Sequence, residues 1–208
     1  MDLFNSFCCD NFLKEPDKIV DFSKNLLFEK SPYINGSRTK NISEIDNKLF
    51  KYINLKIINN IYPSIGYVEF DASTHFQKSV SDICDGWVHS DPNLITAILY
   101  LNKEGTHGTS IYKKKKEYDE MDQTGKHEYF LKPDEKTKNI ILQKKQENNS
   151  KFERTISFSG VYNRLVCFSG PTPHAADVND DLEESYMNTV ILLDPKNEEA
   201  IFNLALLK

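Results

Sequence analysis

The sequence predicts a mainly β fold with flanking α-helices. Helical patterns lie in the first third of the chain, and short β-forming segments separated by glycine, proline and asparagine follow them. Helices first and many short strands later are typical of a β-sandwich or barrel with helices packed outside it. With 208 residues, the chain has enough apolar mass for one sizeable core, so we expect a single domain over residues 1–208.

Two amphipathic helices are predicted, over residues 16–29 and 44–61. The first begins with a proline, which suits the first helical turn, and carries apolar residues with helical spacing. In the second, five apolar residues recur at four-residue steps, and Ser43 with Asp46 resembles a capping box at its start.

Six short segments are predicted strands, and a terminal helix is predicted over 196–207. The first strand alternates between apolar and polar residues, and the second is a continuous apolar run that suits a strand buried on both faces. The strands are expected at 65–71, 94–101, 108–112, 155–159, 164–168 and 188–193.

Residues 113–151 differ in composition from the rest of the chain. They hold 11 Lys and Arg residues against 8 Asp and Glu, whereas the whole chain has a net charge of −5. Such a charged run is typical of a solvated, partly helical insertion. A lid over the site, or a patch for an acidic partner, is the functional alternative.

Composition excludes several classes of function. The negative net charge argues against a surface that coats nucleic acid, and no apolar run approaches a membrane span. The N-terminus has no basic region and no small-residue cleavage site, so secretion is not indicated. The four cysteines show no repeated spacing, so we expect reduced thiols and a cytoplasmic location.

His89 and Asp91 are the residues that most directly indicate chemistry. One residue separates them, and on an extended segment residues i and i+2 point to the same face. An imidazole and a carboxylate can therefore converge on one cation. The best candidate for a third ligand is His174, just past a predicted strand in a turn rich in Gly and Pro. Two histidines and one carboxylate indicate a non-haem Fe(II) oxygenase.

Several motifs resemble the Fe(II)/2-oxoglutarate-dependent dioxygenase superfamily. The chain is similar to prolyl-hydroxylase-like members, in particular to a poorly characterised bacterial and phage branch. The resemblance covers nearly the whole chain, because its motifs occur in the family's order. These motifs are SPYINGSRT, WVHSD, ILYLN, HGTSIY and NRLVCFSG with PH following.

The resemblance implies a double-stranded β-helix (jelly-roll) core, with helices bracing one sheet. It implies that His89, Asp91 and His174 bind iron, that 2-oxoglutarate chelates the iron, and that dioxygen takes the last open position. Hydroxylation of the substrate would then accompany formation of succinate and carbon dioxide. The resemblance argues against halogenation, because halogenating relatives leave the carboxylate position to chloride and Asp91 fills it here.

The distal carboxylate of 2-oxoglutarate needs a cation or several hydrogen-bond donors. The resemblance implies a tyrosine donor, which Tyr100 matches, and a basic residue on the strand after the second histidine. This chain departs from the pattern, because no Lys or Arg lies between His174 and Lys196. The expected cosubstrate-binding residues are therefore Tyr100, Thr109, Arg164, Tyr186 and Asn188, with Arg164 as the substitute cation.

For two further residues, Arg38 and Trp87, a structural role is more expected than contact with the substrate. Arg38 could face the substrate, but tying its turn to the core is more expected. Trp87, the only tryptophan, is expected to pack beneath the metal rather than to bind substrate.

The sequence is compatible with three functional hypotheses. The first is a dioxygenase that hydroxylates a protein side chain, a nucleotide or a metabolite. The second is a non-catalytic binding or structural module on the same fold, which the missing basic anchor favours. The third is a hydrolase that uses the same ligands with zinc.

Overall fold

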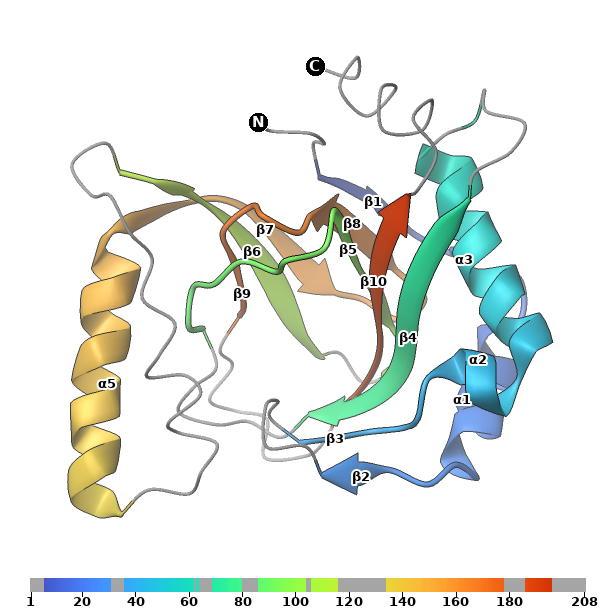
Figure 1. Ribbon diagram of the computed structural model, residues 1–208, viewed down its shortest axis with the longest axis horizontal. Helices are drawn as coiled ribbons and strands as arrows, with labels where there is room; N and C mark the ends of the chain where they lie inside the picture. Colours follow the sequence, from blue (N-terminus) through green and yellow to red (C-terminus); the bar gives the residue numbers. More distant parts are fainter. Residues whose placement is uncertain are drawn as a thin grey trace.

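Two antiparallel sheets form the jelly-roll core of the protein (Figure 1). The computed structural model describes residues 6–30, 36–61, 63, 69–79, 86–103, 106–115, 134–177 and 186–195, with the backbone alone at 79, 106–107 and 186–195. The mainly β class predicted from the sequence is confirmed. The strands are β1 (Phe7–Cys9), β2 (Glu29–Lys30), β3 (Ser37–Arg38), β4 (Phe70–Ser79), β5 (Ile95–Tyr100), β6 (Thr106–Lys114), β7 (Phe152–Gly160), β8 (Leu165–Ser169), β9 (His174–Ala176) and β10 (Tyr186–Pro195).

Strands that are distant in sequence alternate within each sheet. The larger sheet has the order β1-β8-β5-β10-β4-β3-β2, and the smaller sheet has the order β7-β6-β9. The last described strand, β10, pairs with β4 on one side and with β5 on the other. The larger sheet is therefore continuous only with β10 in place between β4 and β5.

Helices cover one face of the larger sheet, on the right in Figure 1. They are α1 (Pro16–Lys24), α2 (Ile42–Ile45) and α3 (Asn47–Ile61). The apolar stripe of α3 packs with Phe76, Leu99 and Leu165 in the main hydrophobic core. Asn54 of α3 donates a hydrogen bond to Thr74 of β4 at 3.0 Å, which pairs a buried polar group within this layer.

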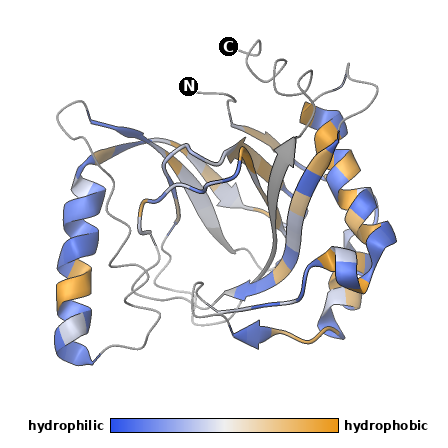
Figure 2. Ribbon diagram, in the orientation of Figure 1, coloured by the Kyte–Doolittle hydropathy of each residue, from blue (hydrophilic) through white to orange (hydrophobic). Residues whose placement is uncertain are grey.

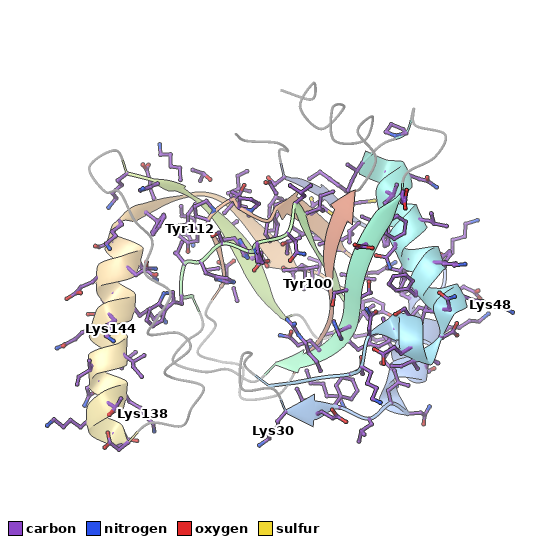
Figure 3. The ribbon with its side chains drawn as sticks, viewed as in Figure 1. Lys30, Lys48, Tyr100, Tyr112, Lys138 and Lys144 are labelled. Carbon is purple, nitrogen blue, oxygen red and sulfur yellow. The ribbon has the colours of Figure 1, made fainter. Side chains whose placement is uncertain are left out.

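The opposite face of the larger sheet turns toward the smaller sheet. Tyr100 of β5 and Phe168 of β8 cluster there with Ile111 of β6, so side chains of both sheets meet in one interior. Figure 3 shows Tyr100 lying within this interior.

Helix α5 (Glu135–Ser150) lies beside the smaller sheet, on the left in Figure 1. Figure 2 shows it as hydrophilic apart from one apolar band, where Ile141 packs on Trp87. It is the described helical part of the charged segment 113–151; residues 116–133 lie outside the described residues. The role of this segment as a lid stays a prediction.

None of the helices in the described ranges has both the length and the apolar character that crossing a membrane requires.

Several predicted elements have different boundaries in the structure. The helix predicted over 16–29 ends at Lys24, where the backbone N–H of Asn25 bonds to carbonyls of the last turn. The helix predicted over 44–61 is interrupted at Asp46, whose extended backbone separates α2 from α3. The predicted capping box is wrong, because Asn41 caps α2 and the carboxylate of Asp46 accepts from Lys48 and Leu49 instead.

Strand predictions were closer for the central strands than for the edges. Five of the predicted segments overlap β5, β6, β7, β8 and β10. The strand predicted at 65–71 lies mostly outside the described residues, and β4 continues to Ser79. The short strands β1, β2, β3 and β9 were not predicted, and the terminal helix predicted at 196–207 lies outside the described residues.

Candidate metal centre

The backbones of His89 and His174 are paired directly. The N–H of His89 donates to the carbonyl of His174 at 2.9 Å, and the N–H of His174 donates to the carbonyl of His89 at 2.8 Å. His174 is the first residue of β9, which pairs with β6, so His89 forms an isolated bridge on the other side of β9. Two segments 85 positions apart in the sequence are thereby held in a fixed register.

The side chains of His89, Asp91 and His174 converge. One candidate donor atom from each residue lies within 4.8 Å of the other two. Asp91 Oδ1 is 4.0 Å from His89 Nε2, and Asp91 Oδ2 is 3.5 Å from His174 Nε2. Metal–ligand bonds of about 2.1 Å keep donors within about 4.2 Å of each other, so the three need to close by only a fraction of an ångström to share one ion.

Both imidazole rings are oriented by a carbonyl two residues earlier. His89 Nδ1 lies 2.9 Å from the carbonyl oxygen of Trp87, and His174 Nδ1 lies 2.8 Å from that of Thr172. A ring that donates through Nδ1–H to a carbonyl presents the lone pair of Nε2. Both histidines therefore offer Nε2 toward Asp91, as ligands of one ion would.

Asp91 is fixed through its side chain and its backbone. Thr96 of β5 donates to Asp91 Oδ2 at 2.7 Å, and the N–H of Asp91 donates to the carbonyl of Gly170 at 2.8 Å. Burial raises the pKa of Asp91, but interactions with His174, His89 and Thr96 outweigh this and hold the pKa well below its ordinary value. The carboxylate is therefore ionised and available as a metal ligand at neutral pH.

The loop after Asp91 needs a glycine opposite it. A Cβ at Gly170 would lie 2.0 Å from the carbonyl oxygen of Asn93 and 3.3 Å from that of Asp91. Only a residue without a side chain allows these backbones to approach so closely. Gly170 of the NRLVCFSG motif thus sets the distance between β8 and the loop that carries Asp91.

Exposure differs across the three candidate ligands. The side chain of His174 is 6% exposed, whereas those of His89 and Asp91 are 20% and 22% exposed. The ring of Phe168 packs against His174, with centroids 4.5 Å apart. The site is thus closed on the His174 side and accessible from the side of His89 and Asp91.

Tyr100 and Thr109 are brought together in the interior between the sheets. Tyr100 is buried, and its hydroxyl lies 2.6 Å from Thr109 Oγ1. Burial raises the pKa of Tyr100, so its hydroxyl stays protonated and remains a hydrogen-bond donor. Thr109 lies on β6 two residues before Ile111, the register partner of His174. This hydroxyl pair therefore belongs to the same interior as the three candidate ligands.

Arg164 is held in a two-pronged ion pair with Asp10. Its Nε and Nη2 atoms donate to the two carboxylate oxygens at 2.5 and 2.9 Å, and Nη1 donates to the carbonyl of Ser159 at 3.0 Å. Arg164 lies opposite Tyr100 along the sheet, because the N–H of Tyr100 donates to the carbonyl of Arg164. Tyr186 and Asn188 lie on β10, whose side chains are outside the described residues.

The C-terminal end of α5 holds the segment that precedes His89, a contact that the sequence did not indicate. Asn149 Oδ1 accepts from the N–H of Val88 at 3.0 Å, and Asn149 Nδ2 donates to the carbonyl of Gly86 at 2.6 Å. Asn148 donates to the carbonyl of Val88 at 2.8 Å. Consecutive asparagines near the end of a helix were the only local signal.

Comparisons with known proteins identify a family and a fold. The family described as "Family of unknown function (DUF6445)" matches residues 74–188, which is more than half of the chain. This region contains all three candidate metal ligands. Among curated proteins, no match is found.

Solved structures with a similar fold include non-haem α-ketoglutarate-dependent enzymes. HygX from Streptomyces hygroscopicus, solved with nickel and 2-oxoglutarate bound, is 7% identical, with 93% of this chain and 84% of HygX covered and a TM-score of 0.57. SnoN, a non-haem α-ketoglutarate-dependent epimerase from nogalamycin biosynthesis, is 10% identical, with coverages of 92% and 78% and a TM-score of 0.52. SnoK, a carbocyclase from the same biosynthesis, is also 10% identical, with coverages of 92% and 80% and a TM-score of 0.52. At these identities the likeness shows the fold alone.

Proposed function

The chain belongs to the DUF6445 family, and we propose that it is a non-haem Fe(II)- and 2-oxoglutarate-dependent dioxygenase that hydroxylates its substrate. The convergence of His89, Asp91 and His174 carries this proposal. Two imidazoles and one carboxylate that leave open coordination positions are the ligand set of such enzymes. The fold shared with HygX and SnoN supports the same chemistry.

Iron would be held by Nε2 of His89, Nε2 of His174 and the carboxylate of Asp91. When bound, Fe(II) would activate dioxygen as the oxidant, with two electrons from the decarboxylation of 2-oxoglutarate to succinate and two from the hydroxylated substrate. The protein positions these ligands: two backbone carbonyls orient the imidazoles, and Thr96 orients the carboxylate. Such supporting hydrogen bonds tune metal affinity and geometry.

The distal carboxylate of 2-oxoglutarate would be bound at Tyr100 and Thr109. Their hydroxyls are buried, adjacent and in the same interior as the candidate ligands. Arg164 would add a positive charge beside Tyr100, but Asp10 already neutralises much of that charge. Tyr186 and Asn188 stay predictions as further donors from β10.

A non-catalytic binding module is the second candidate. It is favoured by the ion pair of Arg164 with Asp10, together with the lack of Lys or Arg in residues 175–195. Such a module would retain the interior and its ligands but would bind 2-oxoglutarate weakly or not at all.

The remaining expectations concern partners and location. The substrate stays open among a protein side chain, a nucleotide and a metabolite; the cosubstrate is a small molecule. HygX has been solved with hygromycin B bound, which is a property of that enzyme. The free thiols of Cys8, Cys9 and Cys167 are consistent with a cytoplasmic location.

Iron-dependent formation of succinate from 2-oxoglutarate tests the proposal. We expect the wild-type protein to form succinate with Fe(II), 2-oxoglutarate and dioxygen, and the Asp91→Ala variant to form none. Folding of both proteins is checked by circular dichroism. A folded wild-type protein that binds Fe(II) but binds no 2-oxoglutarate and forms no succinate would support the binding module.

A further inference from the structure

Arg38 lies in a row of residues that crosses the larger sheet from Glu29 of β2, its register partner on one side, to Tyr100 of β5. It pairs in register with Gln77 of β4, Gln77 pairs with Asn188 of β10, and Asn188 pairs with Tyr100 of β5. Residues directly opposite each other on neighbouring strands point to the same face of the sheet. Arg38 therefore belongs to the same sheet face as Tyr100.

This face is the one that borders the candidate metal centre. Phe76, next to Gln77, packs in the helix-covered core, so Gln77 points to the opposite side. Gln77 Oε1 accepts a hydrogen bond from Arg38 Nε at 2.6 Å, which confirms that the two side chains share a face. Tyr100, at the other end of the row, packs with Ile111 and Phe168 between the two sheets.

Among the described residues, Arg38 forms no ion pair, although Glu29 of β2 is its register partner; the side chain of Glu29 is exposed. The hydrogen-bond partner of Arg38 among these residues is the neutral amide of Gln77. Burial lowers the pKa of Arg38, which shows that the guanidinium is desolvated. The charge of Asp91 raises the pKa of Arg38, so Asp91, a candidate metal ligand, lies within electrostatic reach of the guanidinium. Guanidinium stays protonated in proteins, so this is a permanent cation that faces the site.

We infer that Arg38 binds a carboxylate group of the molecule that occupies the site. A desolvated guanidinium with free N–H donors forms strong, two-pronged hydrogen bonds with a carboxylate. This inference rests on the proposed function and adds a chemical class to it: the substrate carries a carboxylate near the carbon that is hydroxylated.

The position of Arg38 favours the substrate over 2-oxoglutarate as the source of this carboxylate. Two strands, β4 and β10, separate β3 from β5. Three strand spacings place the backbones of Arg38 and Tyr100 about 14 Å apart. A 2-oxoglutarate whose distal carboxylate is bound by the hydroxyls of Tyr100 and Thr109 would therefore hold that carboxylate three strand spacings from the backbone of Arg38.

Side-chain NMR of arginine tests the inference without knowledge of the substrate. The sequence contains three arginines, Arg38, Arg154 and Arg164, so arginine-labelled protein gives three Nε–Hε signals. The probes are acetate and its neutral analogue acetamide, added to metal-free protein. We expect acetate to shift the Arg38 signal with at least a tenfold lower dissociation constant than the signal of exposed Arg154, and acetamide to leave it in place.

Arg38→Met assigns the signal and should abolish this high-affinity acetate binding. Arg154→Met makes the same chemical change at an exposed position of β7 and should leave it unchanged. If Arg38→Met does not fold, Arg38→Gln removes the charge while keeping a donor for Gln77. An Arg38 signal that responds to acetate no more than Arg154, or equally to acetamide, would overturn the inference.

Anaerobic titration with Fe(II) and 2-oxoglutarate distinguishes the two sources of the carboxylate. Unchanged 2-oxoglutarate affinity in Arg38→Met would assign the carboxylate to the substrate, as expected. A tenfold loss would assign it to 2-oxoglutarate. A wild-type protein that binds no 2-oxoglutarate would contradict the proposed function, and the acetate titration would still decide the role of Arg38.

Discussion

Two arginines near the interior of the jelly roll, Arg38 and Arg164, have different partners. Arg164, opposite Tyr100, donates to both oxygens of Asp10 and to a backbone carbonyl. Arg38, which β4 and β10 separate from the strand of Tyr100, donates to the neutral amide of Gln77. The first cation has a carboxylate partner from its own chain, whereas the second has a desolvated charge directed toward the candidate metal centre.

The difference shows that a cation on a site-facing strand is not by itself an anion-binding residue. A bidentate ion pair satisfies both the charge and the planar donor geometry of a guanidinium. Binding a ligand at Arg164 therefore requires displacement or sharing of Asp10, whereas binding at Arg38 requires neither. The partner of each arginine thus distinguishes their roles better than its position in the sequence.

The largest effect is expected from Asp91→Ala, which removes one of the three proposed ligands of the metal centre. One oxygen ligand and its Thr96 hydrogen bond are lost together. We expect Fe(II) affinity to fall more than about a hundredfold, because loss of supporting contacts alone typically costs about tenfold to a hundredfold. The fluorescence of Trp87, the only tryptophan, reports binding two residues from His89. Thr96→Val, which keeps all three ligands, should lose less.

Asn149→Leu tests whether α5 supports the metal centre independently of either arginine. The substitution removes both hydrogen bonds to the Gly86–Val88 backbone. We expect about a tenfold loss of Fe(II) affinity, at the lower end of the usual range for supporting contacts. Acetate binding at Arg38 should be unchanged. Gln146→Leu, at an exposed position of the same helix, is the matched control. Equal losses in the two variants would contradict the role of Asn149.

Asp10→Asn should make Arg164 resemble Arg38, because it removes the carboxylate with which Arg164 forms an ion pair. Without its carboxylate partner, Arg164 can donate to the distal carboxylate of 2-oxoglutarate beside Tyr100. We expect 2-oxoglutarate to bind about threefold to tenfold more tightly, which corresponds to about 0.7–1.4 kcal/mol. The measurement is anaerobic titration of the Fe(II) protein. Adding Arg164→Met should remove the gain, and a gain that persists in the double variant would exclude Arg164 as its cause.

Acid should break the ion pair between Arg164 and Asp10, as Asp10→Asn does. The expected effect is a small decrease in the free energy of unfolding. The hydrogen bond from Arg164 lowers the pKa of Asp10 below its ordinary value of 3.8. A depressed pKa stabilises the fold above pH 3.8, and this contribution is lost as the pH falls through the pKa of the folded protein. Below pH 3.8, the free energy of unfolding should therefore fall more steeply in wild type than in Asp10→Asn. Parallel acid limbs in urea denaturation would show that the ion pair adds no measurable stability.

Local patterns predicted the central strands and the spacing of the first two candidate ligands. The LITAILYL run is β5, and the one-residue spacing places His89 and Asp91 on one side of an extended segment. Both features depend on residues close in sequence. His174 was also proposed from the sequence, although it lies in a short strand rather than a turn.

Long-range pairings were not predictable in this way. The Arg164–Asp10 pair joins residues 154 positions apart, and it depends on β1, a three-residue strand with no alternating pattern. The Asn149–Gly86 contact spans 63 positions. Arg38 was expected to tie its turn to the core, and only the register of β3 with β4 shows that it shares a face with Tyr100. These contacts depend on the order of the strands in the sheets, and local periodicity in the sequence does not predict that order.

The most direct test of the proposed function is anaerobic addition of Fe(II) and then 2-oxoglutarate to the wild-type protein. Chelation of Fe(II) by 2-oxoglutarate at a site of two histidines and one carboxylate gives a visible metal-to-ligand charge-transfer band. We expect this band to appear and saturate in wild type, and to be absent in folded Asp91→Ala. A folded wild-type protein that shows no band, or a band that is unchanged in Asp91→Ala, would contradict the assignment of His89, Asp91 and His174 as an iron centre.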